Sequence, residues 1–215
     1  MKKEIITDSG IYSYEEIKLY NGRKLLNPEI SKKNLSDFKK VMDKHGIIFG
    51  LWFGTLLGAV REKNFIEYDE DIDIFILDED RKKVLNALFD LESIGLKVAR
   101  YNEKKGLLSI IRDYDYIDMY FYRKVFNTRR MGPNTIKAKY LENMDTIDFL
   151  GEAYPLPANV EQVLSILYGK DWKIPKRDGK PVNKTFERRV KIFMNEKLPF
   201  IGNIYRKYIK QFLLF

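Results

Sequence analysis

Hydrophobic and polar positions along the chain follow two periods, one typical of helices and one typical of strands. Over residues 31–44 the apolar side chains recur every three or four positions (Leu35, Phe38, Val41 and Met42), which predicts an amphipathic helix. Further helices are expected over residues 12–20, 55–61, 81–94 and 157–168. Alternating or short continuous apolar runs predict strands over residues 47–53, 69–77, 96–101, 107–112 and 116–122, and a small hairpin over 146–154.

Helices and strands therefore alternate along most of the chain, which predicts an α/β (mixed α+β) fold, a mixed β-sheet flanked by helices. We expect a core over residues 1–155 and a helical, basic C-terminal extension over residues 156–215 that packs on it. Residues 123–144 are basic, weakly periodic and contain Gly132-Pro133, so this segment is expected to be a long loop.

Acidic residues alternate with aliphatic ones in the expected strand over 69–77. Asp69, Asp71 and Asp73 would project from one face of that strand and the isoleucines from the other. Three carboxylates within about 13 Å repel one another unless a cation lies among them, and Mg²⁺ prefers oxygen ligands of this kind. The segment therefore predicts a divalent metal site, with a solvent-facing acidic sheet edge as the alternative.

The expected strand over 116–122 carries another acid. Asp118 is flanked by apolar and aromatic residues, where a charged side chain needs a reason. We expect it beside Asp71 and Asp73, as a third metal ligand or as a general base that takes a proton from an acceptor hydroxyl. The alternative is an Asp that caps a turn or pairs with a nearby Arg.

Glycine marks the point where the expected strand over 47–53 turns into a helix. Gly54 lets a ligand approach closely, and backbone N–H groups at a helix N-terminus bind phosphate oxygens. Thr55 would cap the helix and donate a hydrogen bond to the same phosphate. Arg61 and Lys63 follow and would neutralise a diphosphate, with solvated surface as the alternative.

Composition narrows the classes of protein further. The chain has no cysteine, which excludes disulfides, thiolate zinc sites and cysteine nucleophiles. Its net charge of +8 is concentrated near the C-terminus, where residues 170–215 contain 13 Lys/Arg and 4 Asp/Glu. Apolar side chains recur at helical spacing over 201–212 with cations on the other face, so this helix either packs on the domain or lies on an anionic membrane surface. We expect no signal peptide and no membrane-spanning run.

Four motifs, taken in order, resemble the LicD family. They are Gly-Thr-Leu-Leu-Gly-Ala-Val-Arg at 54–61, Asp-Glu-Asp-Ile-Asp-Ile at 69–74, an Ile-Asp-hydrophobic strand at 116–120, and Leu-Pro, a helix and Leu-Tyr-Gly-x-x-Trp within 151–172. The family includes bacterial phosphocholine transferases and is related to the fukutin-type phosphoribitol transferases. The resemblance implies a nucleotidyltransferase fold, Mg²⁺ or Mn²⁺ as cofactor, and a CDP-linked donor whose phosphoalcohol passes to a glycan with CMP as leaving group.

The resemblance also assigns roles to single residues. Glu67-Tyr68 stands where the family usually has Pro-Trp, and Lys63-Asn64 where it has Lys-Gly, departures that bear on the substrate more than on the chemistry. The residues that match functional positions are the metal-binding acids Asp69, Asp71 and Asp73, the catalytic acid Asp118, the phosphate-contacting Gly54 and Thr55, and the basic residue Arg61.

These expectations favour a metal-dependent transferase that moves a phosphocholine-like group from a CDP-activated donor to a sugar or glycan acceptor, soluble or lipid-linked, in cell-surface polysaccharide or lipopolysaccharide biosynthesis. Two alternatives remain, transfer of NMP itself to a small hydroxylated acceptor and a basic nucleic-acid-binding module. The acidic strand argues against a nucleic-acid partner, because without metal it would repel phosphate. We expect the protein in the cytoplasm, with peripheral attachment to the inner face of the cell membrane through the C-terminal helix as an alternative.

Overall fold

The computed structural model describes residues 2–19 and 24–175, and the structural statements below concern this part of the chain. Its first elements are β1 (Lys2–Thr7), β2 (Gly10–Glu15), α1 (Pro28–Lys44), β3 (Phe49–Leu51), α2 (Phe53–Arg61), β4 (Ile72–Leu77) and the 3-10 turn η1 (Asp78–Asp80). The later elements are α3 (Arg81–Asn86), α4 (Leu88–Ser93), β5 (Lys97–Asn102), β6 (Leu107–Arg112), β7 (Asp115–Val125), β8 (Thr128–Met131), β9 (Asn134–Lys137), α5 (Ala138–Glu142), β10 (Met144–Phe149), β11 (Glu152–Pro157) and α6 (Val160–Tyr168).

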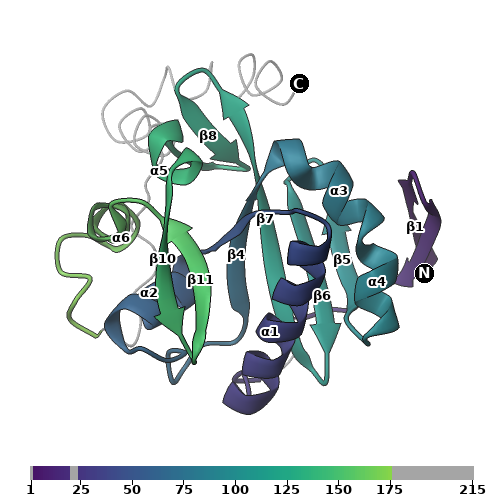
Figure 1. Cartoon of the computed structure of the whole chain (residues 1–215), viewed down its shortest axis with the longest axis horizontal. Helices are drawn as coiled ribbons and strands as arrows, with labels where there is room; N and C mark the ends of the chain where they lie inside the picture. The colour runs from purple at the N-terminus through teal and green to yellow at the C-terminus, as the bar shows by residue number, and fades with distance from the viewer. Residues whose placement is uncertain (1, 20–23, 176–215) are drawn as a thin grey trace, which may run out of the picture. The chain divides into compact units, whose positions relative to one another are not determined.

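A mixed sheet with the strand order β3-β4-β7-β6-β5 forms the centre of the molecule (Figure 1). β4 and β7 run parallel, and the other neighbours along this path are antiparallel. β8 pairs with the far end of β7, and β9 pairs with β8. Two further hairpins, β1–β2 and β10–β11, lie outside this sheet. The predicted fold, a mixed sheet flanked by helices, is confirmed.

The central strand β4 presents different side chains to its two faces. Because side chains alternate along a strand, Ile74 and Ile76 face away from Asp73. Phe38 of α1 packs edge-on against Phe49, with ring centroids 5.1 Å apart, and Phe49 is the cross-strand partner of Ile76. The helix α1 therefore covers the aliphatic face, and the face that carries Asp73 is left to the turn that begins α2.

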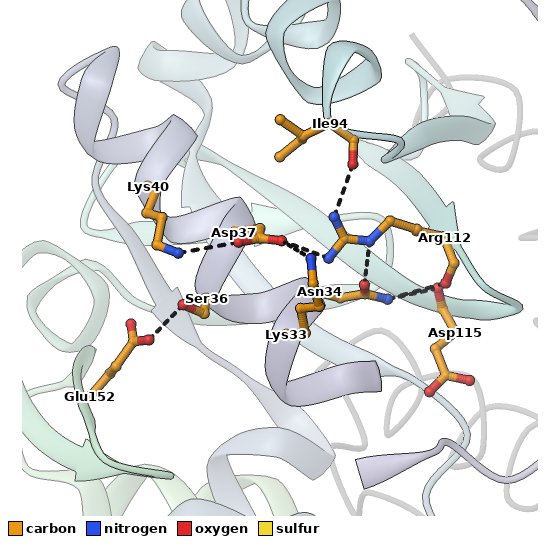
Figure 2. Close-up of polar contacts among 9 residues, drawn as sticks. All are labelled: Lys33, Asn34, Ser36, Asp37, Lys40, Ile94, Arg112, Asp115 and Glu152. Carbon is orange, nitrogen blue, oxygen red and sulfur yellow. Dashed lines mark hydrogen bonds and ion pairs between the residues drawn. The ribbon is translucent and has the colours of Figure 1, made fainter. Parts of the chain in front are cut away.

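A polar network ties α1 to the turn between β6 and β7 (Figure 2). Arg112 donates to Asn34 Oδ1 (2.8 Å) and to an Asp37 carboxylate oxygen (2.9 Å), while the Asn34 amide donates to the Arg112 carbonyl (3.2 Å). Asp115, which is buried at the first position of β7, accepts hydrogen bonds from residues at the start of α1. These contacts fix the beginning of β7, three residues before Asp118.

Two predicted segments are wrong. Residues 12–20 do not form a helix, because Tyr12 and Tyr14 point into the core at the two-residue period of β2, which pairs with β1. Residues 123–144 are not a long loop, because β7 continues to Val125 and β8, β9 and α5 follow. The predicted helix over 81–94 is present as two shorter helices, α3 and α4.

The predicted boundary between core and C-terminal extension stays a prediction, and it falls inside β11. The helix α6 packs against β11. Residues 176–215, with the predicted terminal helix and most of the basic tail, lie outside the described residues. Within residues 2–19 and 24–175, no helix combines the length and the apolar character that crossing a bilayer requires.

Candidate active site

Asp73 is held at the second position of β4 by contacts from two neighbouring elements. Its side chain is 6% exposed. Oδ2 accepts the backbone N–H of Gly54 (3.1 Å), and Oδ1 accepts the hydroxyl of Tyr120 (2.9 Å). The backbone is fixed as well, since the Asp73 N–H donates to Thr55 Oγ1 (2.9 Å) and the Asp73 carbonyl accepts the N–H of Trp52 (2.9 Å). The turn before α2 and the strand β7 together define the position of this carboxylate.

The turn that begins α2 has an unusual backbone. Phe53 has φ of +36°, a left-handed conformation that a bulky residue rarely adopts, and strain of this kind concentrates at functional sites. The Phe53 ring packs edge-on against Tyr120, with centroids 5.0 Å apart. Trp52 is fully buried and donates its indole N–H to the Tyr122 hydroxyl (3.1 Å). These aromatic contacts hold the strained turn in place.

Asp69 and Asp71 lie in the segment that approaches β4. The predicted strand over 69–77 is therefore wrong for its first three residues, since β4 begins at Ile72. Instead of pairing within the sheet, Asp69 donates its N–H to the Ile66 carbonyl (3.0 Å) and accepts the Leu26 N–H at its carbonyl (3.0 Å). The acids approach one another because this segment bends toward the start of α2, and not because they share one face of a strand.

The closeness of Asp69 requires glycine at position 54. A Cβ added to Gly54 would lie far inside van der Waals contact of Asp69 Oδ2 and 3.1 Å from its Cγ. The missing side chain lets this carboxylate reach the N-terminus of α2, where the helix dipole favours negative charge. Asp69 Oδ2 is buried and has no hydrogen-bond partner among the described residues. A buried oxygen left in this way costs free energy, so it is well suited to a ligand that satisfies it.

Burial and mutual repulsion raise the pKa values of these acids. Burial raises the pKa of Asp69 to about 6. Burial also raises the pKa of Asp73 well above its ordinary value, and the nearby charges of Asp71, Asp69 and Asp118 raise it further. The pKa of Tyr120 is raised in turn by burial and by the Asp73 carboxylate. A group of carboxylates removed from water attracts a cation, and perturbed groups of this kind cluster at functional sites.

Asp118 lies beside Asp73, because the parallel pairing of β4 and β7 puts the two residues in register. It is 1% exposed. Its Oδ2 accepts hydrogen bonds from Arg100 (3.1 Å) and from the Tyr120 hydroxyl (3.4 Å), and its Oδ1 accepts from Arg100 (3.3 Å) and from the Ser109 hydroxyl. Tyr120 thus bridges the two carboxylates. The structure brings Asp118 to the predicted place and also pairs it with an arginine, while its chemical role stays a prediction.

The acids fit a divalent cation in part. Among the described residues, no three His, Asp or Glu side chains converge closely enough to form a ready-made metal site. Asp69, with its unsatisfied oxygen, and Asp71 both lie within electrostatic reach of Asp73, and carboxylate oxygens suit Mg²⁺ or Mn²⁺. Asp118 fits the role of metal ligand less well, because Arg100 and two hydroxyl groups already contact its oxygens.

The residues predicted to bind phosphate have different surroundings. The N–H of Gly54 and the hydroxyl of Thr55 both bond to Asp73, so in this structure they position the carboxylate. Thr55 is fully buried. Lys63 is exposed in the segment after α2, with φ of +55°. Contact of these three residues with phosphate stays a prediction.

The Leu-Tyr-Gly-x-x-Trp motif, residues 167–172, contacts the end of α2. Arg61, at the end of α2, donates to the Trp172 carbonyl (3.1 Å), and Trp172 is 6% exposed. Burial raises the pKa of Tyr168 well above its ordinary value, and the charges of Asp73 and Asp69 raise it further, so this phenol lies near the acids. The motif and the acidic segment, about a hundred residues apart in the sequence, therefore belong to one site.

Sequence reasoning missed Arg100, Ser109 and Tyr120. Tyr120 follows Asp118 by two positions and so shares its face of β7, a signal that was present in the strand period. Ser109 lies on β6 as the cross-strand partner of Asp118, and Arg100 lies on β5. No motif marks these two residues, because only the sheet order brings them to the site.

Comparison with known proteins agrees with this geometry. Residues 46–159, just over half of the chain, match the family described as LicD/FKTN/FKRP, nucleotidyltransferase domain. The human ribitol-5-phosphate transferase FKTN is 27% identical over 155 residues, 67% of this chain and 33% of the human protein. The lipopolysaccharide cholinephosphotransferase LicD of Haemophilus influenzae is 33% identical over 55 residues, 26% of this chain and 21% of that protein. The chain spans about a third of the length of FKTN.

A solved structure supports the fold. The solution structure of the antibiotic-resistance factor ANT(2'')-Ia matches 86% of this chain and 96% of its own, with a TM-score of 0.51 and 13% sequence identity. At that identity the likeness concerns the fold alone. The family match includes the turn at Gly54, the acidic segment and Asp118. The chain therefore belongs to the LicD/FKTN/FKRP family and has its nucleotidyltransferase fold.

Proposed function

We propose that this protein is a metal-dependent transferase that moves a phosphoalcohol from a CDP-activated donor to a hydroxyl of a glycan acceptor. The observation that carries the proposal is the buried Asp73 carboxylate, which is fixed at the start of α2 and surrounded by three other acids. Family membership supports the class of reaction, since two relatives are a ribitol-5-phosphate transferase and a lipopolysaccharide cholinephosphotransferase.

We assign the cation to the acids and the donor phosphates to the turn at the start of α2. Asp69, Asp71 and Asp73 would hold the cation, which when bound neutralises phosphate charge and polarises the phosphorus that is attacked. Gly54 and Thr55 lie at the N-terminus of α2, where backbone N–H groups favour phosphate oxygens. Arg61 ends this helix and Lys63 follows it, and we assign both to the charge that develops on the leaving nucleotide.

Asp118 is the group that we assign to the acceptor. Its carboxylate takes the proton of the acceptor hydroxyl as that oxygen forms a bond to the phosphorus nearest the transferred alcohol. The bond from this phosphorus to the bridging oxygen breaks, and CMP departs with the electron pair. Arg100 and Ser109 orient the carboxylate, and Tyr120 sets its position relative to Asp73.

The substrates place the reaction in a biological setting. We propose a sugar or glycan acceptor, soluble or lipid-linked, in cell-surface polysaccharide or lipopolysaccharide biosynthesis on the cytoplasmic side of the membrane. Choline and ribitol are the first alcohols to test, because the relatives named above transfer them as phosphates. Nucleic acid is not proposed as a partner.

Product analysis tests the proposal directly. The full chain is incubated with Mg²⁺ and a panel of CDP-alcohols, with and without glycan acceptors, and CMP release is followed. We expect CMP with at least one donor, and its loss in Asp73→Asn but not in Glu4→Gln, which changes an exposed acid of β1. Release of pyrophosphate from a nucleoside triphosphate, with no CMP from any CDP-alcohol, would replace this function with nucleotidyl transfer. Equal CMP release by Asp73→Asn and the wild type would refute the assignment of the site.

A further inference from the structure

The ribbon formed by the end of β7 with β8 and β9 carries an unbalanced charge. Its residues, 123–137, include five Lys or Arg and no Asp or Glu. The strands pair antiparallel through the register Arg123↔Arg130 and continue from β8 to β9. In Figure 1 this ribbon lies at the end of β7 that is far from the start of α1. The segment that the sequence indicates as a basic loop is thus an ordered basic hairpin.

The register of the ribbon sorts its residues into two faces. Arg123 and Arg130 are cross-strand partners and project from one face, and Lys137 of β9 shares that face. Arg123 and Lys137 are exposed and Arg130 is partly exposed. On the opposite face Arg129 and Ile136 are buried, 4% and 5% exposed. The outer face of the ribbon therefore carries three cations, beside Val125, Thr128 and Thr135.

The buried face anchors the ribbon to the rest of the protein. Arg129 forms ion pairs with Glu79 of η1 (2.7 Å) and Glu142 of α5 (2.7 Å), and Lys124 also pairs with Glu142 (3.2 Å). The acids near the ribbon therefore neutralise its inner cations. The exposed Arg123 and Lys137 lie on the other face of this anchored ribbon.

A single aromatic side chain stands at the tip of the ribbon. Phe126, in the turn between β7 and β8, is 95% exposed and has φ of +50°. Neither property stabilises the fold. The left-handed region suits Gly or Asn better than Phe, and an exposed phenyl ring contributes no hydrophobic stabilisation. The exposed ring is therefore available for a contact outside the chain.

We propose that this ribbon, with Phe126 at its tip and Arg123, Arg130 and Lys137 on its outer face, docks the protein on an anionic membrane surface. Cations attract the negative headgroups, and an aromatic side chain enters the boundary between headgroups and acyl chains. The arrangement fits a membrane better than a single-stranded nucleic acid, which is bound by several aromatic side chains along a basic groove.

The ribbon is separate from the acidic site. Eight residues of extended chain separate Asp118 from Phe126, a distance of about 25 Å along β7 and its turn. Docking through the ribbon would hold the acidic site near the membrane surface. The inference does not depend on the proposed reaction, since it concerns binding alone.

Vesicle binding by the full chain tests the inference. Vesicles of equimolar phosphatidylglycerol and phosphatidylcholine are compared with pure phosphatidylcholine vesicles by co-sedimentation. We expect binding to the anionic vesicles only, weakened by salt. Phe126→Ala should weaken it about tenfold or more. The double variant Arg123→Gln/Lys137→Gln should weaken it about 25-fold, at about fivefold for each cation. Matched controls are Ile6→Ala, which removes an apolar side chain that is 84% exposed elsewhere, and Lys97→Gln on exposed β5 surface.

Fluorescence reports the tip itself. In Phe126→Trp the new indole should shift its emission to the blue on anionic vesicles and be quenched by lipids with brominated acyl chains, while Trp52 and Trp172 are buried and serve as background. Binding that the ribbon variants leave unchanged would overturn the inference and assign the membrane contact to another part of the chain. Salt-sensitive binding of RNA without any binding of vesicles would overturn it in favour of a nucleic acid.

Discussion

Replacing Asp69 with Asn should make the metal-free protein more stable while it removes the activity. Burial raises the pKa of Asp69 to about 6 from an ordinary value of 3.8, and its Oδ2 has no hydrogen-bond partner among the described residues. An acid whose pKa is higher in the folded state binds more protons there than in the unfolded state between the two pKa values. The free energy of unfolding therefore falls as pH rises from 3.8 to 6, and above pH 6 the wild type bears the whole destabilisation.

The size of the effect follows from the same two pKa values. A difference of about 2 units corresponds to roughly 3 kcal/mol. Asp69 keeps some exposure to solvent, and the amide of Asn would itself lack a full set of partners, so we expect a gain of about 1–2 kcal/mol. For a chain of this length such a gain raises Tm by about 2–8 °C. Near pH 4, where the folded wild type is already protonated at Asp69, the gain should fall below about 1 kcal/mol.

Urea unfolding in EDTA at about pH 7.5 and about pH 4 measures the difference. Glu67→Gln, which alters a nearby exposed acid, should leave the free energy of unfolding unchanged at both pH values. Adding Mg²⁺ at the higher pH should stabilise the wild type and not Asp69→Asn, because a ligand that binds only the folded site raises its stability. The reasoning is refuted if Asp69→Asn is less stable than the wild type at about pH 7.5, or if its gain is the same at both pH values.

Three further changes probe the same site. Asp73→Asn should lower CMP release at least about a thousandfold with an unchanged near-UV circular dichroism spectrum, because it removes the central carboxylate and keeps its shape. Gly54→Ala should lower CMP release about a hundredfold, because the added methyl group displaces Asp69 from the start of α2; activity at the wild-type rate would contradict the close packing seen there. Arg100→Ala should destabilise the fold by about 1–3 kcal/mol in urea unfolding, because it leaves buried Asp118 without the Arg100 cation. It should also lower kcat more than it raises KM. An equal loss of stability and kcat in Arg100→Lys and Arg100→Ala would argue against a charge effect.

The positions of those helices and strands whose apolar periodicity reflects burial could be predicted from the sequence. The helix α1 appears at Pro28–Lys44 where 31–44 is predicted, and the β6–β7 and β10–β11 hairpins appear near their predicted places. The predicted helix over 12–20 failed because Tyr12 and Tyr14 are buried only through the pairing of β2 with β1. A two-residue period over so short a segment is easily taken for part of a helical one.

The ribbon of β8 and β9 was missed for an electrostatic reason. Arg129 is the most polar kind of residue, yet it is 4% exposed, because Glu79 and Glu142 neutralise it. Those acids are fifty residues before it and thirteen after it, so neither marks a strand at this position. A pattern that treats each arginine as exposed therefore indicates a loop here. Side-chain pairing across the fold decided the structure of this segment.

At the candidate site too, residues within local motifs could be predicted, and contacts between distant strands could not. The sequence places acids at 69, 71, 73 and 118 and a glycine at 54, and the structure brings them together. The strand pattern in the sequence gives the wrong cause for the proximity of Asp69. This acid lies before β4, and it comes close to the site because Gly54 has no side chain. The arginine on β5 that pairs with Asp118 depends on the order of strands, which no local pattern contains.

The geometry around Asp73 explains how such a group of acids exists at all. Gly54, Thr55 and Tyr120 fix this carboxylate and its backbone with uncharged hydrogen-bond partners, so its position does not depend on a cation. Uncharged partners orient Asp73 without neutralising it, so burial and the charges of the neighbouring acids still raise its pKa in the folded protein. A divalent cation would relieve that repulsion on binding, and the free energy that the fold loses in holding the acids together would reappear as affinity for the metal. Under the proposed function, the Asp73 carboxylate would thus already hold its position before a cation and the substrate's phosphates arrive.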